Sequence, residues 1–545
     1  MAQPNLSTHV ELTISCMYSD LVKLDLATAS DPIVFIQTRN PATKKWQHFD
    51  KTERIKNKSN PKFAKQISIE YKFEESQPLR FVVLDADRED LDGNRLKSFD
   101  KIGKIKCQLS EIISAPGGTF VRTLENKKHP HRKNGNIAIN FIEINRGLEG
   151  WNVKWQWSGL GLDKKDLFGK SDPYLVFERF HENGSFLTVH KTPVIKNTLN
   201  PDWDLFEIPI SRLAPASSAS PIRITCFDWD AHGTHDLIGS VSFTVDELRA
   251  GRREFSLINE EKKHKKGHKY TDSGRLQLRN YTEYKKPSFL DYLRGGTEVS
   301  LSIAIDYTGS NGNPKTATSL HYFDPNGVLN EYASAIRVVG DICAPYDRSG
   351  MFPVYGFGAT IDNVGGDTKH CFEVNRNPQD PRIPGIDGVL TAYRESFSWL
   401  NLSGPTYFGP LLDRINSVAS QRKDGSVYHL LLLLTDGVIN DVEQTIRSLR
   451  LTSDLPVSII IVGVGSADFS GMNVLDDDDG RLGLKRDCVQ FVPFREFKNG
   501  PISALAAKTL MEVPAQVVQF MMQHGINPRP PPVVNPLPNP AAPVQ

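Results

Sequence analysis

The first half of the chain repeats one order of sequence signals, and this repeat restricts its fold. Residues 10–145 and 150–285 both contain short runs of alternating apolar and polar residues separated by turn residues. Each copy has an Asn-Pro turn, a strand ending in Asp-x-Asp, a later Asp-x-Ile-Gly and a final strand that follows a glycine. Short alternating runs at this spacing are typical of antiparallel sandwiches. The sequence therefore predicts two all-β antiparallel sandwiches in succession.

Aspartates recur at matched positions in the two copies, at strand ends on two separate loops. They are Asp25, Asp31, Asp85, Asp87 and Asp100 in the first copy, and Asp166, Asp172, Asp228, Asp230 and Asp236 in the second. Aspartate often caps turns, but turn formation does not require five of them at matched positions in two copies. Carboxylates gathered at one tip repel each other unless a cation neutralises them, and Ca²⁺ takes about six to eight oxygen ligands. We therefore predict one calcium site in each copy.

This pattern resembles the C2 domain, a sandwich that binds calcium and phospholipid. The second copy has the spacing of the family, whereas the third loop of the first copy is longer. The fifth ligand of the first copy could be Asp90, Asp92 or Asp100, and the shared Asp-x-Ile-Gly favours Asp100. The strand order resembles the circularly permuted topology of the family. The resemblance implies calcium-dependent binding to anionic, phosphatidylserine-like membranes.

Two features near the tips could add to membrane binding. Leu167 and Phe168 lie between the first two aspartates of the second copy, and inserting one such side chain into a bilayer is worth roughly 1.5–3 kcal/mol. Basic runs at residues 127–133 and 262–269 precede the last strand of each copy. We expect both runs to be solvated loops, which contribute to lipid binding only if they face the bilayer.

From Glu298 the pattern changes to strands that alternate with amphipathic helices. The predicted strands are Val299–Ile305, Phe352–Gly358, Leu430–Leu434, Val457–Val464 and Val489–Pro493. The predicted helices are Asn330–Val339, Ile386–Trp399, Pro410–Ser420 and Val442–Leu449, and a further short helix is predicted at Ser288–Arg294, in the linker before Glu298. This alternation indicates a mostly parallel sheet with helices on both faces. We therefore predict an α/β, Rossmann-like domain after the two sandwiches.

Three turns of this α/β domain carry oxygen ligands at the ends of predicted strands or before helices. They offer Asp306, Thr308 and Ser310 on the first turn, Thr406 on the second and Asp436 on the third. In open α/β sheets, ligands bind outside the carboxyl ends of the strands, and Mg²⁺ prefers oxygen ligands in octahedral geometry. The sequence therefore predicts a site for Mg²⁺ or Mn²⁺.

These turns resemble the metal-ion-dependent adhesion site of the von Willebrand factor A fold, with Thr308 in place of the more usual serine. In that family an acidic residue of a partner completes the coordination of the metal. Two C2 domains followed by such a domain form the architecture of the copines. Stretches that carry the resemblance include 305–311, 319–322, 351–359, 434–438 and 489–494. It implies an adaptor that moves from the cytosol to membranes when calcium rises and recruits proteins through its A-type domain.

The domain boundaries that we expect follow from these changes of pattern. They are 1–145 for the first C2 domain, 146–285 for the second, 286–297 for a linker, 298–517 for the A-type domain and 518–545 for a flexible proline-rich tail. The net charge of +1 argues against general nucleic-acid binding. With no signal-peptide pattern and no apolar run of membrane-spanning length, we expect a cytoplasmic protein that is recruited peripherally to the plasma membrane.

The sequence favours a binding protein over an enzyme. It contains neither a P-loop nor a nucleophile elbow. Asp306 and Asp436 could hold a metal for hydrolysis, but no adjacent general base is evident. The alternatives are a constitutive, calcium-independent scaffold and, with less support, a protein kinase-like or metal-dependent enzyme.

Overall fold

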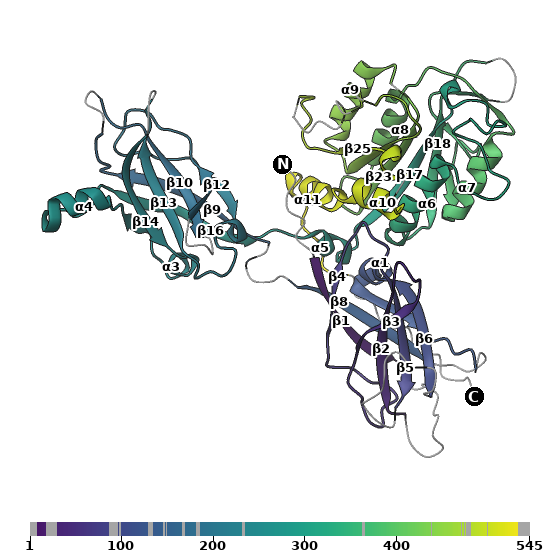
Figure 1. Cartoon of the computed structure of the whole chain (residues 1–545), viewed down its shortest axis with the longest axis horizontal. Helices are drawn as coiled ribbons and strands as arrows, with labels where there is room; N and C mark the ends of the chain where they lie inside the picture. The colour runs from purple at the N-terminus through teal and green to yellow at the C-terminus, as the bar shows by residue number, and fades with distance from the viewer. Residues whose placement is uncertain are drawn as a thin grey trace. The chain divides into compact units, whose positions relative to one another are not determined.

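The computed structural model describes most of the chain. The described residues are 8–17, 30–86, 96, 100–128, 135–144, 148, 150–165, 169–180, 186–230, 235–361, 366–437, 439–469, 471–472, 475, 481–498 and 500–531. The chain forms two compact units, shown in Figure 1. One unit combines Met1–Ile144 with Phe289–Gln545, and the other is Asn145–Ser288. The second unit is therefore inserted, in sequence, between the two parts of the first.

The first sandwich consists of two four-stranded sheets with the orders β4-β1-β8-β7 and β3-β2-β5-β6. Its strands are β1 (Thr8–Met17), β2 (Pro32–Arg39), β3 (Trp46–Lys51), β4 (Ile67–Tyr71), β5 (Pro78–Asp85), β6 (Lys101–Gln108), β7 (Thr119–Thr123) and β8 (Asn136–Ile144). Helix α1 (Leu109–Ile113) and the short turn η2 (Pro116–Gly118) connect β6 to β7. In β1, Val10, Leu12 and Ile14 are fully buried, which is the two-residue period of a strand with one face in the core.

The second sandwich repeats this topology with the orders β12-β9-β16-β15 and β11-β10-β13-β14. Its strands are β9 (Trp151–Leu160), β10 (Pro173–Phe180), β11 (Phe186–Lys191), β12 (Phe206–Pro209), β13 (Ile222–Asp228), β14 (Asp236–Phe243), β15 (Glu254–Ser256) and β16 (Arg275–Lys285). Helices α2 (Ile210–Leu213), α3 (Val245–Arg249) and α4 (Glu260–Lys266), and the turn η3 (Gly267–Lys269), lie between strands. Each strand of the first sandwich has its counterpart in the second, so the two predicted all-β sandwiches are confirmed.

Helix α4 corrects the expectation that the second basic run is a loop. The Asn259 side chain caps this helix by accepting a hydrogen bond from the Lys262 amide at 3.1 Å. Acidic residues occupy its first turn and basic residues its last turn, which complements the helix dipole. The first basic run falls largely outside the described residues, which include only Lys127 and Lys128 of it.

The α/β domain is built on a sheet with the order β20-β18-β17-β23-β24-β25, with β21 also paired to β18. The strands are β17 (Glu298–Asp306), β18 (Met351–Phe357), β20 (Phe372–Glu373), β21 (Arg382–Pro384), β23 (Val427–Thr435), β24 (Val457–Gly463) and β25 (Val489–Pro493). Strands β18, β17, β23, β24 and β25 run parallel to one another, whereas β20 and β21 are antiparallel to β18. Strands β19 (Ala359–Ile361) and β22 (Leu400–Leu402) form a separate antiparallel pair.

Helices cover both faces of this sheet. They are α5 (Phe289–Arg294), α6 (Glu331–Cys343), α7 (Gly385–Ser396), α8 (Gly409–Ala419), α9 (Val442–Thr452), α10 (Ser503–Leu510) and α11 (Val513–Gln523), with short turns η4 (Gly309–Asn311), η5 (Ala344–Tyr346) and η6 (Phe494–Phe497). Side chains of α6, α7, α10 and α11 share one hydrophobic core with the sheet, and those of α8 and α9 share another. The predicted α/β domain is therefore confirmed.

Two further features of the α/β domain bear on the sequence expectations. Helix α11 continues to Gln523, beyond residue 517, where we expected the domain to end. None of the helices that the structure describes is both long and apolar enough to cross a membrane.

Candidate metal sites

The carboxyl end of β17 places Asp306 at the centre of the α/β sheet. Strand β17 lies between β18 and β23, so the chain leaves it toward one neighbour and later returns on its other side. Ligands of open α/β sheets bind at such a switch point, outside the strand ends. The side chain of Asp306 is fully buried there.

Hydrogen bonds connect four of the five residues predicted as magnesium or manganese ligands. Asp306 Oδ1 accepts hydrogen bonds from the Thr308 amide at 2.8 Å and from Thr308 Oγ1 at 2.5 Å. Ser310 Oγ donates to Asp436 Oδ1 at 2.9 Å and lies 3.0 Å from Thr308 Oγ1. Two carboxylates and two hydroxyls from two loops therefore converge on one small region.

Thr406, the fifth predicted ligand, is held by the loop that follows Asp436. Its amide donates to Asn440 Oδ1 at 2.9 Å, and the Asn440 amide donates to the Thr406 carbonyl at 2.9 Å. The preceding Ser403 is tied to the first turn, because its carbonyl accepts from the Gly309 amide at 2.5 Å. The structure thus brings the three predicted loops together.

Burial and mutual repulsion shift the acidity of the two carboxyl groups in this cluster. Burial raises the pKa of Asp306 above its usual range. Burial, followed by the charge of Asp306, raises the pKa of Asp436 to about 7. Two carboxylates that resist ionising together are stabilised by a bound cation. Carboxylate and hydroxyl oxygens suit Mg²⁺ or Mn²⁺, so the residues present fit such an ion.

Several residues that support this cluster were not predicted from the sequence. Thr435 Oγ1 donates to Asp306 Oδ2 at 2.7 Å. Asn311 Nδ2 donates to the Thr308 carbonyl at 3.1 Å, and Tyr332 O–H donates to Asn311 Oδ1 at 2.7 Å. The position of Thr435 directly before Asp436 was a readable signal, but Tyr332 lies on α6 and reaches the turn only in three dimensions.

His321 supports the backbone beneath the same cluster. Its Nε2 lies 2.9 Å from the Asp306 carbonyl and its Nδ1 lies 2.7 Å from the Tyr393 hydroxyl. A carbonyl can only accept, so Nε2 carries the proton and the tyrosine donates to Nδ1. Burial lowers the pKa of His321 to about 3, so the ring is neutral and its role is to hold the turn in place.

In the second sandwich, three of the predicted calcium ligands lie on adjacent strand ends. Asp228 ends β13 opposite Pro173 of β10 and opposite Asp236 of β14. The amide of Asp172, directly before β10, donates to Asp228 Oδ1 at 2.5 Å. Asp230 follows β13 by two residues. Asp166, Leu167 and Phe168 lie outside the described residues.

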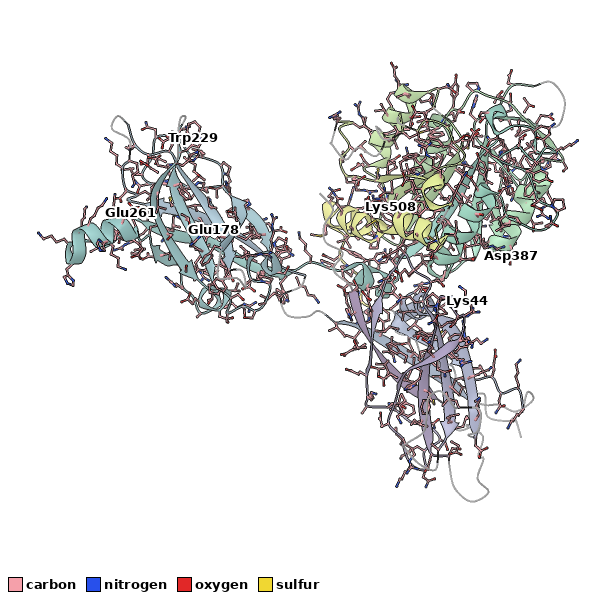
Figure 2. The ribbon with its side chains drawn as sticks, viewed as in Figure 1. Lys44, Glu178, Trp229, Glu261, Asp387 and Lys508 are labelled. Atoms are coloured by element: carbon pink, nitrogen blue, oxygen red, sulfur yellow. The ribbon has the colours of Figure 1, made fainter. Side chains whose placement is uncertain are left out.

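A lysine contacts this aspartate cluster. Lys196 Nζ lies 2.7 Å from Asp172 Oδ2 and 3.4 Å from the ring centroid of Trp229, which is labelled in Figure 2. The other Asp172 oxygen accepts from the Asn197 amide at 2.7 Å. Burial acts to raise the pKa of Asp172, but Lys196 and the Asn197 amide together hold it below its usual range. A cation therefore already stabilises the ionised form of this carboxylate.

The first sandwich arranges its aspartates in the same way. Asp85 ends β5 opposite Pro32, and its Oδ1 accepts from the Asp31 amide at 2.7 Å. The Asp85 amide donates to the Asp100 carbonyl at 3.0 Å. Asp85 Oδ2 is buried and accepts no hydrogen bond from the described residues, so it could serve as a cation ligand.

In the first sandwich, an arginine lies near Asp31. Arg54 Nη1 lies 3.9 Å from Asp31 Oδ2 and donates to the Ala86 carbonyl at 3.0 Å. Asp25 and Asp87 lie outside the described residues, as do the alternative ligands Asp90 and Asp92. Among the described residues, no group of three or more His, Cys, Asp or Glu side chains is arranged to hold a metal.

Comparison with known protein families adds independent findings. The C2 domain family matches residues 11–124 and 156–259, and the copine family matches residues 319–529. The two families together match the two sandwiches and most of the α/β domain.

The chain is also similar to solved structures of C2 domains. One is described as BON1-C2B, at 31% identity over 25% of this chain and 94% of that chain, with a TM-score of 0.21. A plant Extended Synaptotagmin 1 C2A domain matches at 19% identity over 26% of this chain and 99% of that one, with a TM-score of 0.19. The calcium-bound C2A and C2B domains of Extended-Synaptotagmin 2 match at 14% identity over 51% and 97%, with a TM-score of 0.19.

Proposed function

Because the chain belongs to the copine family, with two C2 domains followed by a copine domain, we propose that it is a calcium-dependent adaptor. Its C2 domains bind anionic phospholipid when calcium rises, and its α/β domain recruits partner proteins. The observation that carries this proposal is that Asp172, Asp228 and Asp236 lie at neighbouring strand ends, with the Asp172 amide donating to Asp228 Oδ1.

Calcium acts on this cluster by reversing the charge of the tip. Without calcium, the aspartates repel a phosphatidylserine surface. Ca²⁺ bound among Asp166, Asp172, Asp228, Asp230 and Asp236 replaces that repulsion with attraction. Leu167 and Phe168, together with the partly buried Trp229, supply apolar groups for insertion into the bilayer. In the first C2 domain, the matching calcium ligands are Asp25, Asp31, Asp85, Asp87 and Asp100. The buried Asp85 Oδ2, which accepts no hydrogen bond from the described residues, supports this assignment.

The α/β domain supplies the partner-binding part of this proposal. Asp306 and Asp436 bring two negative charges, which only neutralise a divalent cation, while Thr308, Ser310 and Thr406 add hydroxyl ligands without charge. Mg²⁺ or Mn²⁺ held in this way remains attractive to a further carboxylate. An acidic side chain of a partner protein would provide it.

The lipid-binding part is tested by removing charges from the tip of the second C2 domain. In Asp228→Asn/Asp230→Asn, the calcium needed to sediment the protein with phosphatidylserine vesicles should rise at least tenfold. The matched control is Asp246→Asn/Glu247→Gln on α3, at the far end of β14 from Asp236, where glutamine keeps the helix cap. An unchanged calcium midpoint in the tip variant would refute this assignment.

The partner-binding part is tested separately with Mn²⁺. Asp306→Asn should abolish Mn²⁺ binding to the calcium-free protein, measured by electron paramagnetic resonance, and should abolish capture of partners. The control is Asp387→Asn on α7, because the Asp387 side chain is 88% exposed and is labelled on the domain surface in Figure 2. Equal partner capture in EDTA would show that the metal does not bridge the two proteins.

A further inference from the structure

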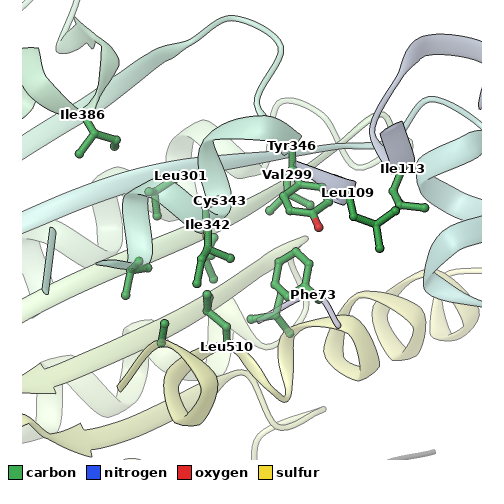
Figure 3. Close-up of a cluster of buried hydrophobic side chains, with 14 of the residues drawn as sticks. Phe73, Leu109, Ile113, Val299, Leu301, Ile342, Cys343, Tyr346, Ile386 and Leu510 are labelled. Carbon is green, nitrogen blue, oxygen red and sulfur yellow. The ribbon is translucent and has the colours of Figure 1, made fainter. Parts of the chain in front are cut away.

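The first C2 domain and the α/β domain share one hydrophobic core. A single cluster of buried side chains includes residues of β1, β4, α1 and β8 from the sandwich and of β17, α6, η5 and α11 from the α/β domain. Figure 3 shows part of this cluster, with Phe73, Leu109 and Ile113 of the sandwich close to Tyr346 and Val299 of the α/β domain. Both domains belong to one compact unit.

Aromatic side chains form the contact between the two domains. Phe73 follows β4 and packs edge-on against Phe289 of α5, with ring centroids 5.3 Å apart. It also packs against Tyr346, at 4.9 Å between centroids. The Tyr71 and Tyr346 hydroxyls lie 2.6 Å apart in a buried hydrogen bond. Each hydroxyl therefore satisfies the other, and loss of either leaves a buried polar group without its partner.

Helix α5 links this contact to the end of the α/β domain. Its residues Phe289, Leu290, Tyr292 and Leu293 are all buried. The Tyr292 hydroxyl donates to the Ile526 carbonyl, just after α11, at 2.9 Å. The stretch 286–297 was expected to be a linker with a short helix at Ser288–Arg294, and the structure packs that helix into the shared core.

The inserted second C2 domain leaves and rejoins this body at neighbouring points. In the sheet order β4-β1-β8, Tyr71 lies opposite Thr8, and His9 lies opposite Ile144. Adjacent strands lie about 4.8 Å apart, so Ile144 is on the order of 10 Å from the Tyr71 end of β4. Phe289, where the chain returns, contacts Phe73 two residues beyond Tyr71. This closeness of the two connections is typical of an inserted domain.

We propose that the first C2 domain and the α/β domain fold and act as one cooperative body, and that the second C2 domain is a separate insert carried on it. The first C2 domain then completes the core of the α/β domain rather than serving only as a lipid-binding module. The proposal does not depend on metal binding at any site, so its failure and that of the proposed function are distinguishable.

The test is pulsed hydrogen exchange of the full chain along a urea gradient, read by mass spectrometry. Peptides from β1 and β8 should lose protection at the same urea concentration as peptides from β17 and β23. Peptides from β9 and β16, in the second C2 domain, should have a midpoint of their own. Separate midpoints for the first C2 domain and the α/β domain would overturn the proposal.

Substitutions at Tyr71 and Tyr346 test whether equal urea midpoints of the first C2 domain and the α/β domain reflect coupling or chance. Tyr346→Phe, in the α/β domain, should lower the midpoint of both that domain and the first C2 domain by on the order of 0.3 M urea. The second C2 domain should be unaffected. The double variant Tyr71→Phe/Tyr346→Phe should recover part of the loss, because it leaves no unpaired hydroxyl. If Tyr346→Phe shifted only the α/β peptides, the two domains would be independent.

Discussion

Replacing Lys196 should make the second C2 domain more sensitive to calcium. The Lys196 ammonium lies 2.7 Å from an oxygen of Asp172, which is a predicted calcium ligand. Ca²⁺ must therefore displace the lysine from this carboxylate or share the carboxylate with the lysine. The substitution Lys196→Gln removes the competing charge and keeps a side chain of similar length.

The size of the effect follows from the exposure of the pair. The Lys196 side chain is 57% exposed and that of Asp172 is 19% exposed, and ion pairs this close to solvent contribute about 0.2–1 kcal/mol. A single and a double positive charge about 5 Å apart repel by about 1.7 kcal/mol in water, and salt and movement of the lysine reduce this. A net gain of about 1 kcal/mol corresponds to about a fivefold lower calcium midpoint.

Isothermal titration calorimetry with Ca²⁺ measures the calcium midpoint directly, without membranes. Residues 145–288 form a compact unit of their own, so they are a suitable sample. The matched control is Lys170→Gln, an exposed lysine whose amide donates to Asn197 Oδ1, next to Lys196, and which should change the midpoint by less than about twofold. A midpoint in Lys196→Gln equal to or above that of the wild type would refute the competition. If the calcium midpoint fell equally in Lys196→Gln and Lys170→Gln, the cause would be the general loss of positive charge rather than competition at Asp172.

Two further predictions concern the α/β domain. Gly358→Ala should reduce Mn²⁺ binding measured by electron paramagnetic resonance, because a methyl group at this position would overlap Thr308 Cγ2. The control Gly350→Ala is also at positive φ but faces open space, so it should leave Mn²⁺ binding unchanged. Unimpaired binding in Gly358→Ala would exclude a strict geometric requirement at Thr308. Burial, aided by Arg422, lowers the pKa of His429 to about 4, so below pH 6.5 the unfolded state binds the proton that the folded state excludes. The His429 contribution alone should therefore lower stability by up to about 3 kcal/mol between pH 6.5 and 4, beside that of the buried His321, and His429→Gln should make a urea-stability profile shallower by that amount; an unchanged profile would remove His429 as a cause.

Local patterns in the sequence were sufficient to predict the two sandwiches and the positions along the chain of the five main parallel strands. Alternation of apolar residues is set by burial of one strand face, so runs such as that of β1 are visible in the sequence. The metal-site residues Asp306, Thr308 and Ser310 follow a strand within five positions, so their convergence was also readable. Helix α4 was missed because its lysines were read as a loop, although the cap Asn259 and the acidic first turn were available signals.

Long-range packing could not be predicted from the same patterns. Nothing local to Phe73 or Phe289 indicates that their rings meet across 216 positions of sequence. Likewise, the contact of Lys196 with Asp172 depends on how two loops fold onto one tip. Tyr332 reaches the Asp306 turn from helix α6, and His321 reaches it from the loop before that helix.

The most direct test of the calcium-dependent adaptor is sedimentation of the full chain with phosphatidylserine vesicles across a titration of free Ca²⁺. We expect binding to rise from near zero to saturation as calcium increases, to reverse with EGTA, and not to be supported by Mg²⁺ alone, because a flexible cage of carboxylates suits the larger ion. Vesicle binding that stayed the same from EGTA to saturating calcium would contradict the proposed calcium switch and favour a constitutive scaffold.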